Sequence, residues 1–510
     1  MSILSWFRTR PGRETPPRPS SYYEGSRQPS GSPRRHWTIS DLSPDKELIT
    51  DLTDLRSKSK DLVNNEAMAA AIIETMTANI VGRNGFRPQS IPLDTIPTDV
   101  SVVQKAAEWE WELFSRNPDM AGPSSLTDML RLIVASRYES GECLLLVRRK
   151  RRKGYRHDLC LQIIDPARLG HGMMSFDERG GRKVTGGVEM DGDGNPVAYW
   201  IAPDHPSEGY MGENVRIPRL ASDGTPNIIH YYRRERPAQT RGRPVLAPVL
   251  NLFRDLSKYR EAKVVAERIA ACVAGFITSP NPYDFIASVG LDVAEQYGIV
   301  PPSSEDYENR NIDLRPGVIH GLYPGEDARF LDPNRPGDTS NDFVEGLLKQ
   351  ICASLGLPVL VVLKDFSQVN YSSARAALLE ARRIYQIEQS FLADRILTPL
   401  WRALFSECVR SGRIPAPGFP AYPEEYMRVR WVGDGWEWVD PVKEVTASDL
   451  AIQANLSTLA REAASRGEDW EAILEQRARE NARMEELGLV AAPEYSEFEV
   501  EDEEFDDEGD

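Results

Sequence analysis

The chain has 510 residues, with a hydrophobic fraction of 41% and a charged fraction of 27%, an ordinary composition for a globular protein. This length is enough for roughly two to four packed regions. The longest apolar stretch, residues 351–363, is interrupted by Gly356 and Pro358 and is too short to span a membrane. The amino-terminal residues also lack the apolar run of a secretory signal, so we expect no membrane partner.

The formal net charge of -17 is distributed unevenly along the chain. Residues 494–510 contain 11 acidic and no basic residues, and the remaining chain carries 67 acidic against 61 basic residues. The composition predicts a solvated acidic tail and, at the other end, a basic arm rich in Pro, Ser and Gly, neither of which would join a core. A mildly acidic body argues against tight binding of nucleic-acid phosphates, which usually requires a basic surface.

Motifs for catalysis or cofactor binding are absent from the sequence. No GxxxxGK[ST], GxSxG or HExxH motif occurs, which argues against a P-loop motor, a serine hydrolase and a zinc protease. His157 and Cys160 have the spacing of some metal ligands, but no second pair accompanies them, so we expect neither a metal nor a cofactor. A nuclease built from dispersed carboxylates stays open. The five cysteines predict buried reduced thiols: Cys143, Cys160, Cys272, Cys352 and Cys408.

The amino-terminal half has the pattern of an α+β region. Apolar periodicity predicts helices over residues 61–81, 102–115 and 125–140, the last capped by Ser124 or Ser125. Short apolar runs then predict a hairpin of strands 142–147 and 159–164, two strands within 184–202, and a strand at 227–232.

Long helices dominate the carboxy-terminal half. Residues 249–274 predict a helical rod of roughly 39 Å with one apolar stripe, followed by a loop-rich, Pro-containing excursion over 276–338. Further helices are predicted over 339–355, 372–407, 442–465 and 469–487. We expect Pro399 to kink the second of these.

Several short sequence motifs occur in the same order as in one known protein family, which this chain resembles. They are AAAIIETMTANIVGRNGFRP (69–88), QTRGRPVLAP at the start of 239–271, LGLP and NYSSARA within 322–383, and WVGDGWEWVDP at the start of 431–474. Together they resemble the lambda-type portal family of tailed bacteriophages. The LGLP and NYSSARA words at their separation are the most specific part of this resemblance.

The resemblance implies a mostly helical α+β subunit with wing, stem, clip and crown regions. Such subunits form a ring, usually a homododecamer, at one capsid vertex, through which DNA is packaged and ejected. The implied partners are further copies of the chain, double-stranded DNA held weakly and without sequence specificity, the terminase large subunit, the major capsid protein, and head-completion and tail adaptor proteins. The implied location is the virion portal vertex after synthesis in the host bacterial cytoplasm. The alternatives are another capsid-associated structural adaptor and, less favoured, a DNA-processing enzyme subunit.

The order of elements maps these regions onto the chain. The predicted division is a basic arm (1–42), wing (43–240), first stem helix (241–275), clip (276–338), second stem helix (339–355), tunnel-loop region (356–371), long kinked helix (372–408), remainder of wing and crown (409–490) and acidic tail (491–510).

A short polar segment is the candidate DNA-channel site. It consists of Lys364, Asp365, Phe366, Ser367, Gln368, Val369 and Asn370. It lies between an apolar stretch that can be anchored in protein and the start of the long helix, as expected of a loop projecting into a water-filled channel. Lys364 and Asp365 nearly cancel in charge, and a lysine can touch phosphates without reading sequence. The alternative for Lys364 is a solvent-exposed lysine that contacts nothing.

Overall fold

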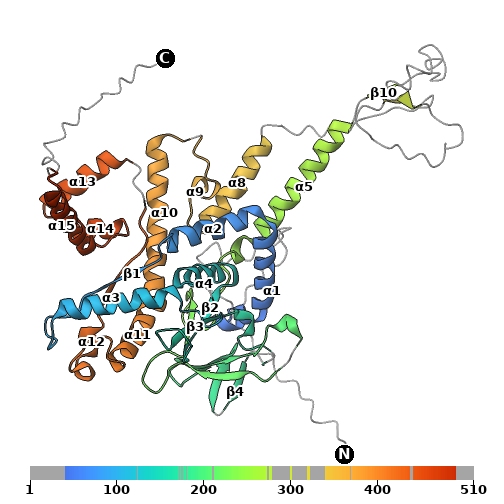
Figure 1. Cartoon of the computed structure of the whole chain (residues 1–510). Coiled ribbons are helices and arrows are strands. Elements are labelled where there is room, and N and C mark those ends of the chain that lie inside the picture. The colour runs from blue at the N-terminus through green and yellow to red at the C-terminus, as the bar shows by residue number, and fades with distance from the viewer. Residues whose placement is uncertain are drawn as a thin grey trace, which may run out of the picture.

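The computed structural model describes residues 41–489, except for short gaps and most of the predicted clip. The gaps are 123, 172, 174–175, 180, 210–211, 273–274, 278–298, 301–318, 322–338, 368 and 437–439. Between residues 269 and 341 only backbone elements are described. The fold is α+β and mostly helical, as predicted, with two antiparallel sheets at one end of a helical body (Figure 1). The predicted tail and all but the last two residues of the predicted arm lie outside the described residues.

Four helices open the described chain. They are α1 (Pro44–Asn65), α2 (Ala67–Val81), α3 (Val100–Arg116) and α4 (Leu126–Ser140). The single helix predicted over 61–81 is wrong, because Glu66 is extended, with φ -114° and ψ 111°, and separates α1 from α2. Ser125 is the cap of α4, and it forms a reciprocal capping box with Asp128.

The predicted hairpin is confirmed and belongs to a three-stranded antiparallel sheet of order β3-β2-β9. Its strands are β2 (Glu142–Arg149), β3 (Leu159–Ile164) and β9 (Ile228–Tyr232). The second sheet is a five-stranded meander of β4 (Phe176–Arg179), β5 (Arg182–Thr185), β6 (Val188–Met190), β7 (Pro196–Ile201) and β8 (Val215–Pro218). Leu144 and Leu146 on one face of β2 pack with Tyr199 and Ile201 in a second core, between the two sheets.

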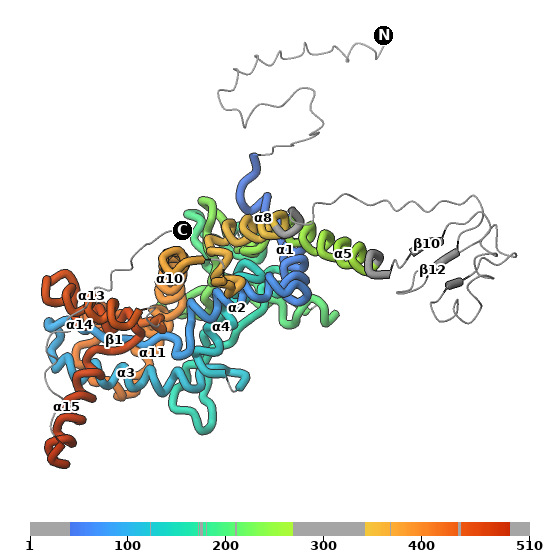
Figure 2. Tube along the Cα trace, turned by 90° about the horizontal axis from the view of Figure 1, so that it is seen from above, coloured from blue at the N-terminus to red at the C-terminus, as the bar shows by residue number. Residues whose placement is uncertain are grey.

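Helix α5 (Leu250–Cys272) leaves the body as a rod (Figures 1 and 2). Phe253 and Leu256 in its first turns are buried, whereas Val264 and Val265 are about half exposed. Helix α8 (Thr339–Ser354) packs against α5, and the rings of Tyr259 and Phe343 lie 5.0 Å apart. At the far end of α5, in and beside the predicted clip, the described backbone forms a parallel sheet of order β10-β12-β11, made of β10 (Gly275–Ile277), β11 (Ile299–Val300) and β12 (Ile319–Gly321).

The long helix has three parts. It consists of α10 (Tyr371–Leu392), a π-helical turn η6 (Ala393–Leu397) and α11 (Thr398–Arg410). The N–H of Thr398 bonds to the carbonyl of Ala393, five residues back, directly before Pro399. Because proline has no N–H and its ring crowds the preceding turn, the interruption expected at Pro399 takes the form of this wider turn.

The remaining chain returns along the body and ends in three helices. Strand β13 (Val429–Val432), after the short α12 (Pro423–Tyr426), pairs antiparallel with β1 (Arg87–Ser90). Then come α13 (Pro441–Gln453), α14 (Leu459–Ser465) and α15 (Trp470–Glu486), beside α10 (Figure 1). The single helix predicted over 442–465 is wrong, because it is broken around Asn455, whose φ is 58°. Ala463 is the one buried residue of these three helices.

Two smaller expectations concern cysteines and membrane spans. The four cysteines whose side chains are described are buried and unpaired, as predicted: Cys143, Cys160, Cys352 and Cys408. None of the described helices combines the length and the apolar character that crossing a membrane requires.

Candidate functional site

The apolar stretch before the candidate channel loop forms a short helix. Helix α9 (Val359–Leu363) follows Pro358 and packs against α2, α8 and α10. Leu357 and Val362 are buried in the main core, whereas Leu363 is exposed. One side of the loop is therefore fixed to the body, as the sequence predicted, and the anchor is a short helix.

The loop itself is exposed. Lys364, Asp365, Phe366, Ser367 and Asn370 are exposed and Val369 is partly buried, whereas Gln368 lies outside the described residues. The carboxylate of Asp365 accepts hydrogen bonds from the backbone N–H of Ser367 at 3.0 Å and from its hydroxyl at 2.7 Å. These bonds lower the pKa of Asp365 and close a tight turn that presents Phe366 to solvent.

Lys364 has a left-handed backbone. It is the C-cap of α9, with φ 57° and ψ 29°, a conformation that costs about 1 kcal/mol for a residue with a Cβ. Its ammonium group forms no ion pair with any carboxylate among the described residues. The lysine is therefore held in place by its backbone, and its charge is available to an external anion.

Asn370 fixes the other side of the loop. Its side-chain oxygen accepts a hydrogen bond from the N–H of Ser373 at 2.8 Å, so it caps α10, which begins at Tyr371. The sequence-based placement of the helix start at Ser372 is therefore wrong by one residue. Both ends of the loop are anchored in helices, and the loop between them is short.

The word QTRGRP lies at the junction between the sheets and α5. The hydroxyl and N–H of Thr240 donate to Asp45 of α1, at 3.0 and 2.8 Å. Gly242 lies so close to Gly141 that a Cβ on it would come within 2.1 Å of the Gly141 carbonyl oxygen. The QTRGRP segment therefore packs the sheets and α1 together where α5 begins. This role could not be predicted from the sequence alone.

Glu142 is the centre of a fully buried charge cluster at this junction. Its carboxylate accepts hydrogen bonds from Arg56 of α1, from Arg241 (Nε–Oε1 2.9 Å) and from the N–H of Gly242 (2.7 Å), and it pairs with His230 of β9 (3.0 Å). Burial favours the protonated acid, but Arg241 and Arg56 outweigh it and hold the pKa of Glu142 well below its ordinary value. Burial lowers the pKa of His230, so the imidazole is a neutral donor.

A second buried ion pair holds the helix that begins at the loop. Arg137 of α4 makes two hydrogen bonds to Glu388 of α10, one of them at 3.1 Å, and its guanidinium lies 5.6 Å from the centre of the Tyr231 ring. This pair joins α10 to α4 and β9. This ion pair could not be predicted from the sequence, because the two residues lie 251 positions apart.

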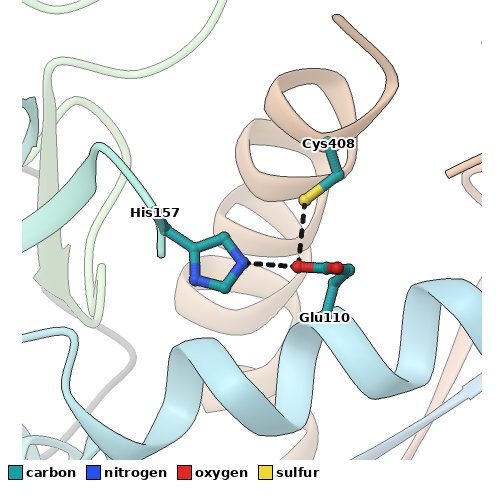
Figure 3. A group of neighbouring side chains, drawn as sticks. All are labelled: Glu110, His157 and Cys408. Carbon is teal, nitrogen blue, oxygen red and sulfur yellow. Dashed lines mark hydrogen bonds and ion pairs between the residues drawn. The ribbon is translucent and has the colours of Figure 1, made fainter. Parts of the chain in front are cut away.

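Glu110, His157 and Cys408 come together between α3, the β2–β3 hairpin and α11 (Figure 3). His157 Nε2 lies 2.8 Å from Glu110 Oε2, and Cys408 Sγ lies 4.0 Å from the same oxygen. The neighbours of His157 are therefore Glu110 and Cys408, and not Cys160, which the sequence spacing had paired with it. The ligand atoms of these three residues lie close enough together to bind one metal ion.

The chemistry of this group does not suit a metal. Arg156 already binds the carboxylate of Glu110, with Nε 2.9 and 3.1 Å from its two oxygens, and Arg413 Nη1 lies 3.9 Å from the thiol sulfur. Burial raises the pKa of Cys408 to about 12. The two arginines place positive charge where a cation would have to bind. The carboxylate of Glu407 also accepts hydrogen bonds from the backbone N–H groups of Asp158 and Leu159. The group therefore clamps the hairpin to the helical body.

Glu108 on α3 gives a pH-dependent prediction. Burial, with smaller contributions from the nearby carboxylates of Asp469 and Glu471, raises the pKa of Glu108 to about 7, against the hydrogen bond from the Ser90 N–H at 2.8 Å. A carboxyl with a raised folded-state pKa contributes stability that is complete below the ordinary value of 4.5 and is lost as pH rises through about 7. Glu108→Gln is therefore expected to stabilise the protein by about 1–2 kcal/mol at pH 8 and by much less at pH 4.5.

Thermal unfolding at the two pH values measures this difference. The matched control is Glu112→Gln, one turn away on α3, where the carboxylate is exposed and pairs with Arg116. Equal shifts for both variants at pH 8 would contradict the role assigned to Glu108.

A protein family and two phage proteins that resemble this chain all carry the description portal protein. Residues 30–389 match the family described as phage portal protein, lambda family. The chain is 24% identical to the portal protein of Escherichia phage N15, over 94% of this chain and 93% of that protein. It is 25% identical to portal protein B of Escherichia phage lambda, over 92% and 90%.

Among solved structures, similar chains occur in the neck of a native gene transfer agent particle, computed with C12 symmetry, and in the virion of such a particle. The first has a TM-score of 0.40 at 13% identity and covers 82% of this chain and 92% of that one. The second has a TM-score of 0.40 at 12% identity and covers 79% and 89%. The family match extends over most of the chain, from the end of the basic arm through α10. The chain belongs to the lambda family of phage portal proteins.

Proposed function

We propose that this chain is the portal, or head-to-tail connector, subunit of a tailed phage. In this role, copies of the chain form a ring at one capsid vertex, and DNA enters and leaves through the central channel. The observation that carries the proposal is the match to the portal family over residues 30–389, together with the near full-length alignment to portal protein B of phage lambda.

The surface of a single chain supports assembly with further copies. Large apolar side chains are exposed on the long helices and on or directly beside the three carboxy-terminal helices: Val264, Val265, Phe343, Tyr371, Leu379, Ile387, Val442, Val445, Leu450, Leu456, Leu459, Leu474, Leu487 and Leu489. Exposed apolar surface of this extent is typical of interfaces between subunits. A ring of identical head-to-tail contacts that closes would cover it on every subunit.

Purified protein is therefore expected to form closed rings with a central hole. Native mass measurement over a concentration series, together with electron microscopy, would reveal the rings and count their subunits. A chain that stays monomeric at micromolar concentration and moderate salt would contradict the proposal. Extended lattices instead of closed rings would indicate a shell protein.

The proposed role is structural rather than catalytic. The terminase large subunit, the major capsid protein and the head-completion and tail adaptor proteins are the partners that this role requires, at the clip, the wing and the ring surface. Pure rings are expected to hydrolyse neither ATP nor DNA. Hydrolysis that stays with the rings through purification would instead favour a DNA-processing subunit.

We further propose that residues 364–370 face the channel and touch DNA while it is packaged. The described residues of the loop are mostly exposed, and α9 and α10 anchor its two ends. Lys364 forms no ion pair with any carboxylate that the structure describes. One lysine offset by the adjacent Asp365 would bind phosphate weakly, which suits a surface past which DNA must slide.

Lys364→Glu is expected to leave ring assembly intact and to impair DNA packaging or retention. An exposed substitution should change the free energy of unfolding by about 0.5 kcal/mol or less. The matched control is Lys364→Asn, which removes the charge but tolerates the left-handed backbone. Packaging would be measured as DNA protected from nuclease inside assembled heads. Normal packaging by Lys364→Glu, and by a chain with residues 364–370 replaced by Gly and Ser, would show that the loop is only a connector.

A further inference from the structure

A large pocket lies between the sheets and the long helix. It has a volume of about 780 Å³ and is lined on one side by β7, β9 and the turn around residue 224, and on the other by α10, η6 and α11. Tyr199, Ile228, Phe391 and Met427 give it an apolar floor. The proposed channel loop lies at the opposite end of α10 and contributes nothing to it.

The rim of this pocket is rich in arginine. Arg219, Arg233, Arg234, Arg395 and Arg402 line it, against the carboxylates of Asp223, Glu388 and Asp394. Two of these carboxylates are already neutralised from outside the pocket. Asp223 pairs with Arg149 at 2.8 Å and with Arg410 at 3.3 Å, and Glu388 pairs with the buried Arg137.

Two rim arginines have no carboxylate partner within the part of the chain that the structure describes. They are Arg219, beside β8, and Arg395, in the π-turn, whose guanidinium lies 5.9 Å from the centre of the Phe391 ring. Arg234 hydrogen-bonds only the hydroxyl of Tyr232, at 3.3 Å. Asp394 alone opposes these three guanidinium groups, so the pocket carries a net positive charge above an apolar floor.

We propose that this pocket binds the acidic carboxy-terminal segment of the chain, residues 494–510. The segment carries 11 carboxylates and no basic residue, and it places Tyr495, Phe498 and Phe505 among them. Aromatic side chains fit the apolar floor, and carboxylates fit the arginine rim, where planar guanidinium groups bind them in pairs of hydrogen bonds. The pocket and the segment are therefore complementary both in charge and in hydrophobicity.

The segment is also long enough to reach the pocket. Helix α15 packs on α3 through Lys105–Glu475 (2.9 Å), and α3 packs on α11, which forms one wall of the pocket. Each helix–helix step covers about 10 Å. The 21 residues after Leu489 can extend about 70 Å. This length is several times that of the two steps from α15 to α3 and from α3 to α11, so the segment can reach the pocket. The inference is independent of the proposed function.

Chemical modification of arginines in the full chain tests the proposal. Phenylglyoxal labelling with peptide mapping would give the modification rates of Arg219 and Arg395, in the natural chain and in a variant whose 11 acidic residues in 494–510 are replaced by their amides. Both arginines are expected to react about threefold faster in the amide variant at low salt, and the difference should shrink in high salt. Arg428 and Arg477, which are exposed and outside the pocket, serve as internal controls.

A reciprocal variant keeps the test decisive. In Arg219→Gln/Arg395→Gln, a Glu-specific protease should cleave within 494–510 about threefold faster than in the natural chain, whereas Arg428→Gln/Arg477→Gln should not change that rate. Unchanged labelling of Arg219 and Arg395 in the amide variant would overturn the proposal, and would leave the pocket to a second copy of the chain or to another acidic protein. Cleavage rates that are equal in the two double variants would overturn it as well.

Discussion

Replacing Glu142 with Gln is expected to lower the free energy of unfolding by about 3–5 kcal/mol. The side chain of Glu142 has no exposed surface, and its carboxylate neutralises Arg56 and Arg241, which are almost fully buried. A neutral amide would leave two guanidinium groups inside the protein without a counter-charge. Desolvation of such groups is far more costly than the loss of a surface ion pair.

Chemical denaturation followed by circular dichroism would measure this loss. The control is Glu424→Gln, where the carboxylate also binds an arginine, Arg402, but both partners are exposed, so the cost should be about 0–1 kcal/mol. Similar losses for the two variants would show that the buried cluster contributes no more than a surface pair. The cluster joins α1, β2 and β9 to Arg241 in the segment that leads into α5. The orientation of α5 relative to the body should therefore also become more variable in Glu142→Gln.

Gly435→Ala is expected to detach the three carboxy-terminal helices from the body. A Cβ on Gly435 would come within 2.1 Å of the backbone carbonyl carbon of Arg466, at the end of α14, and backbone atoms cannot move aside as a flexible side chain can. Among the described residues, the side-chain contacts that join these helices to the rest of the chain include Gln89–Asp469, Gln104–Glu471, Lys105–Glu475 and the long Arg375–Glu444 pair.

Hydrogen–deuterium exchange would show this detachment as fast exchange over residues 441–486, with protection retained in the core helices α3, α4 and α11. The loss of docking should amount to about 2–3 kcal/mol. Gly346→Ala on α8 is the matched control, because no atom lies within 4 Å of the added methyl group, and alanine is the better helix former. Unchanged protection over 441–486 in Gly435→Ala would contradict the close approach of the two backbones.

The sequence predicted the elements that carry strong local signals. Helices α3, α4 and α5 have regular apolar periodicity and nearby stop signals such as Gly141, and strands β2 and β3 are apolar runs on either side of a basic turn. The break at Glu66 could not be predicted, because neither proline nor glycine marks it. Its cause is tertiary, since Glu66 binds Arg260 of α5, 194 residues away.

The polarity of residues 364–370 predicts a loop, but the backbone conformation of this loop could not be predicted from the sequence. A left-handed backbone at Lys364 has no local sign, because lysine rarely adopts it. The sequence places the start of the long helix at residue 372, whereas the side chain that accepts a hydrogen bond from the N–H of Ser373 belongs to Asn370, and the helix begins at Tyr371. The buried charges of Glu142, Glu388 and Glu110 were equally hidden, because their partners are brought together only by the fold.

The π-turn before Pro399 accommodates one extra residue within the long helix. Such a turn holds one residue more than an α-helical turn, so losing any one of residues 393–397 would restore the ordinary bonding pattern. Because the five residues of the π-turn cover about the same rotation as four residues of α-helix, α11 would keep its orientation relative to α10. Trp401 and Cys408 would therefore stay buried, and Arg402 would stay exposed. In related sequences this stretch should tolerate a gap of one residue, and such a gap would mark a subunit whose long helix runs without the wider turn.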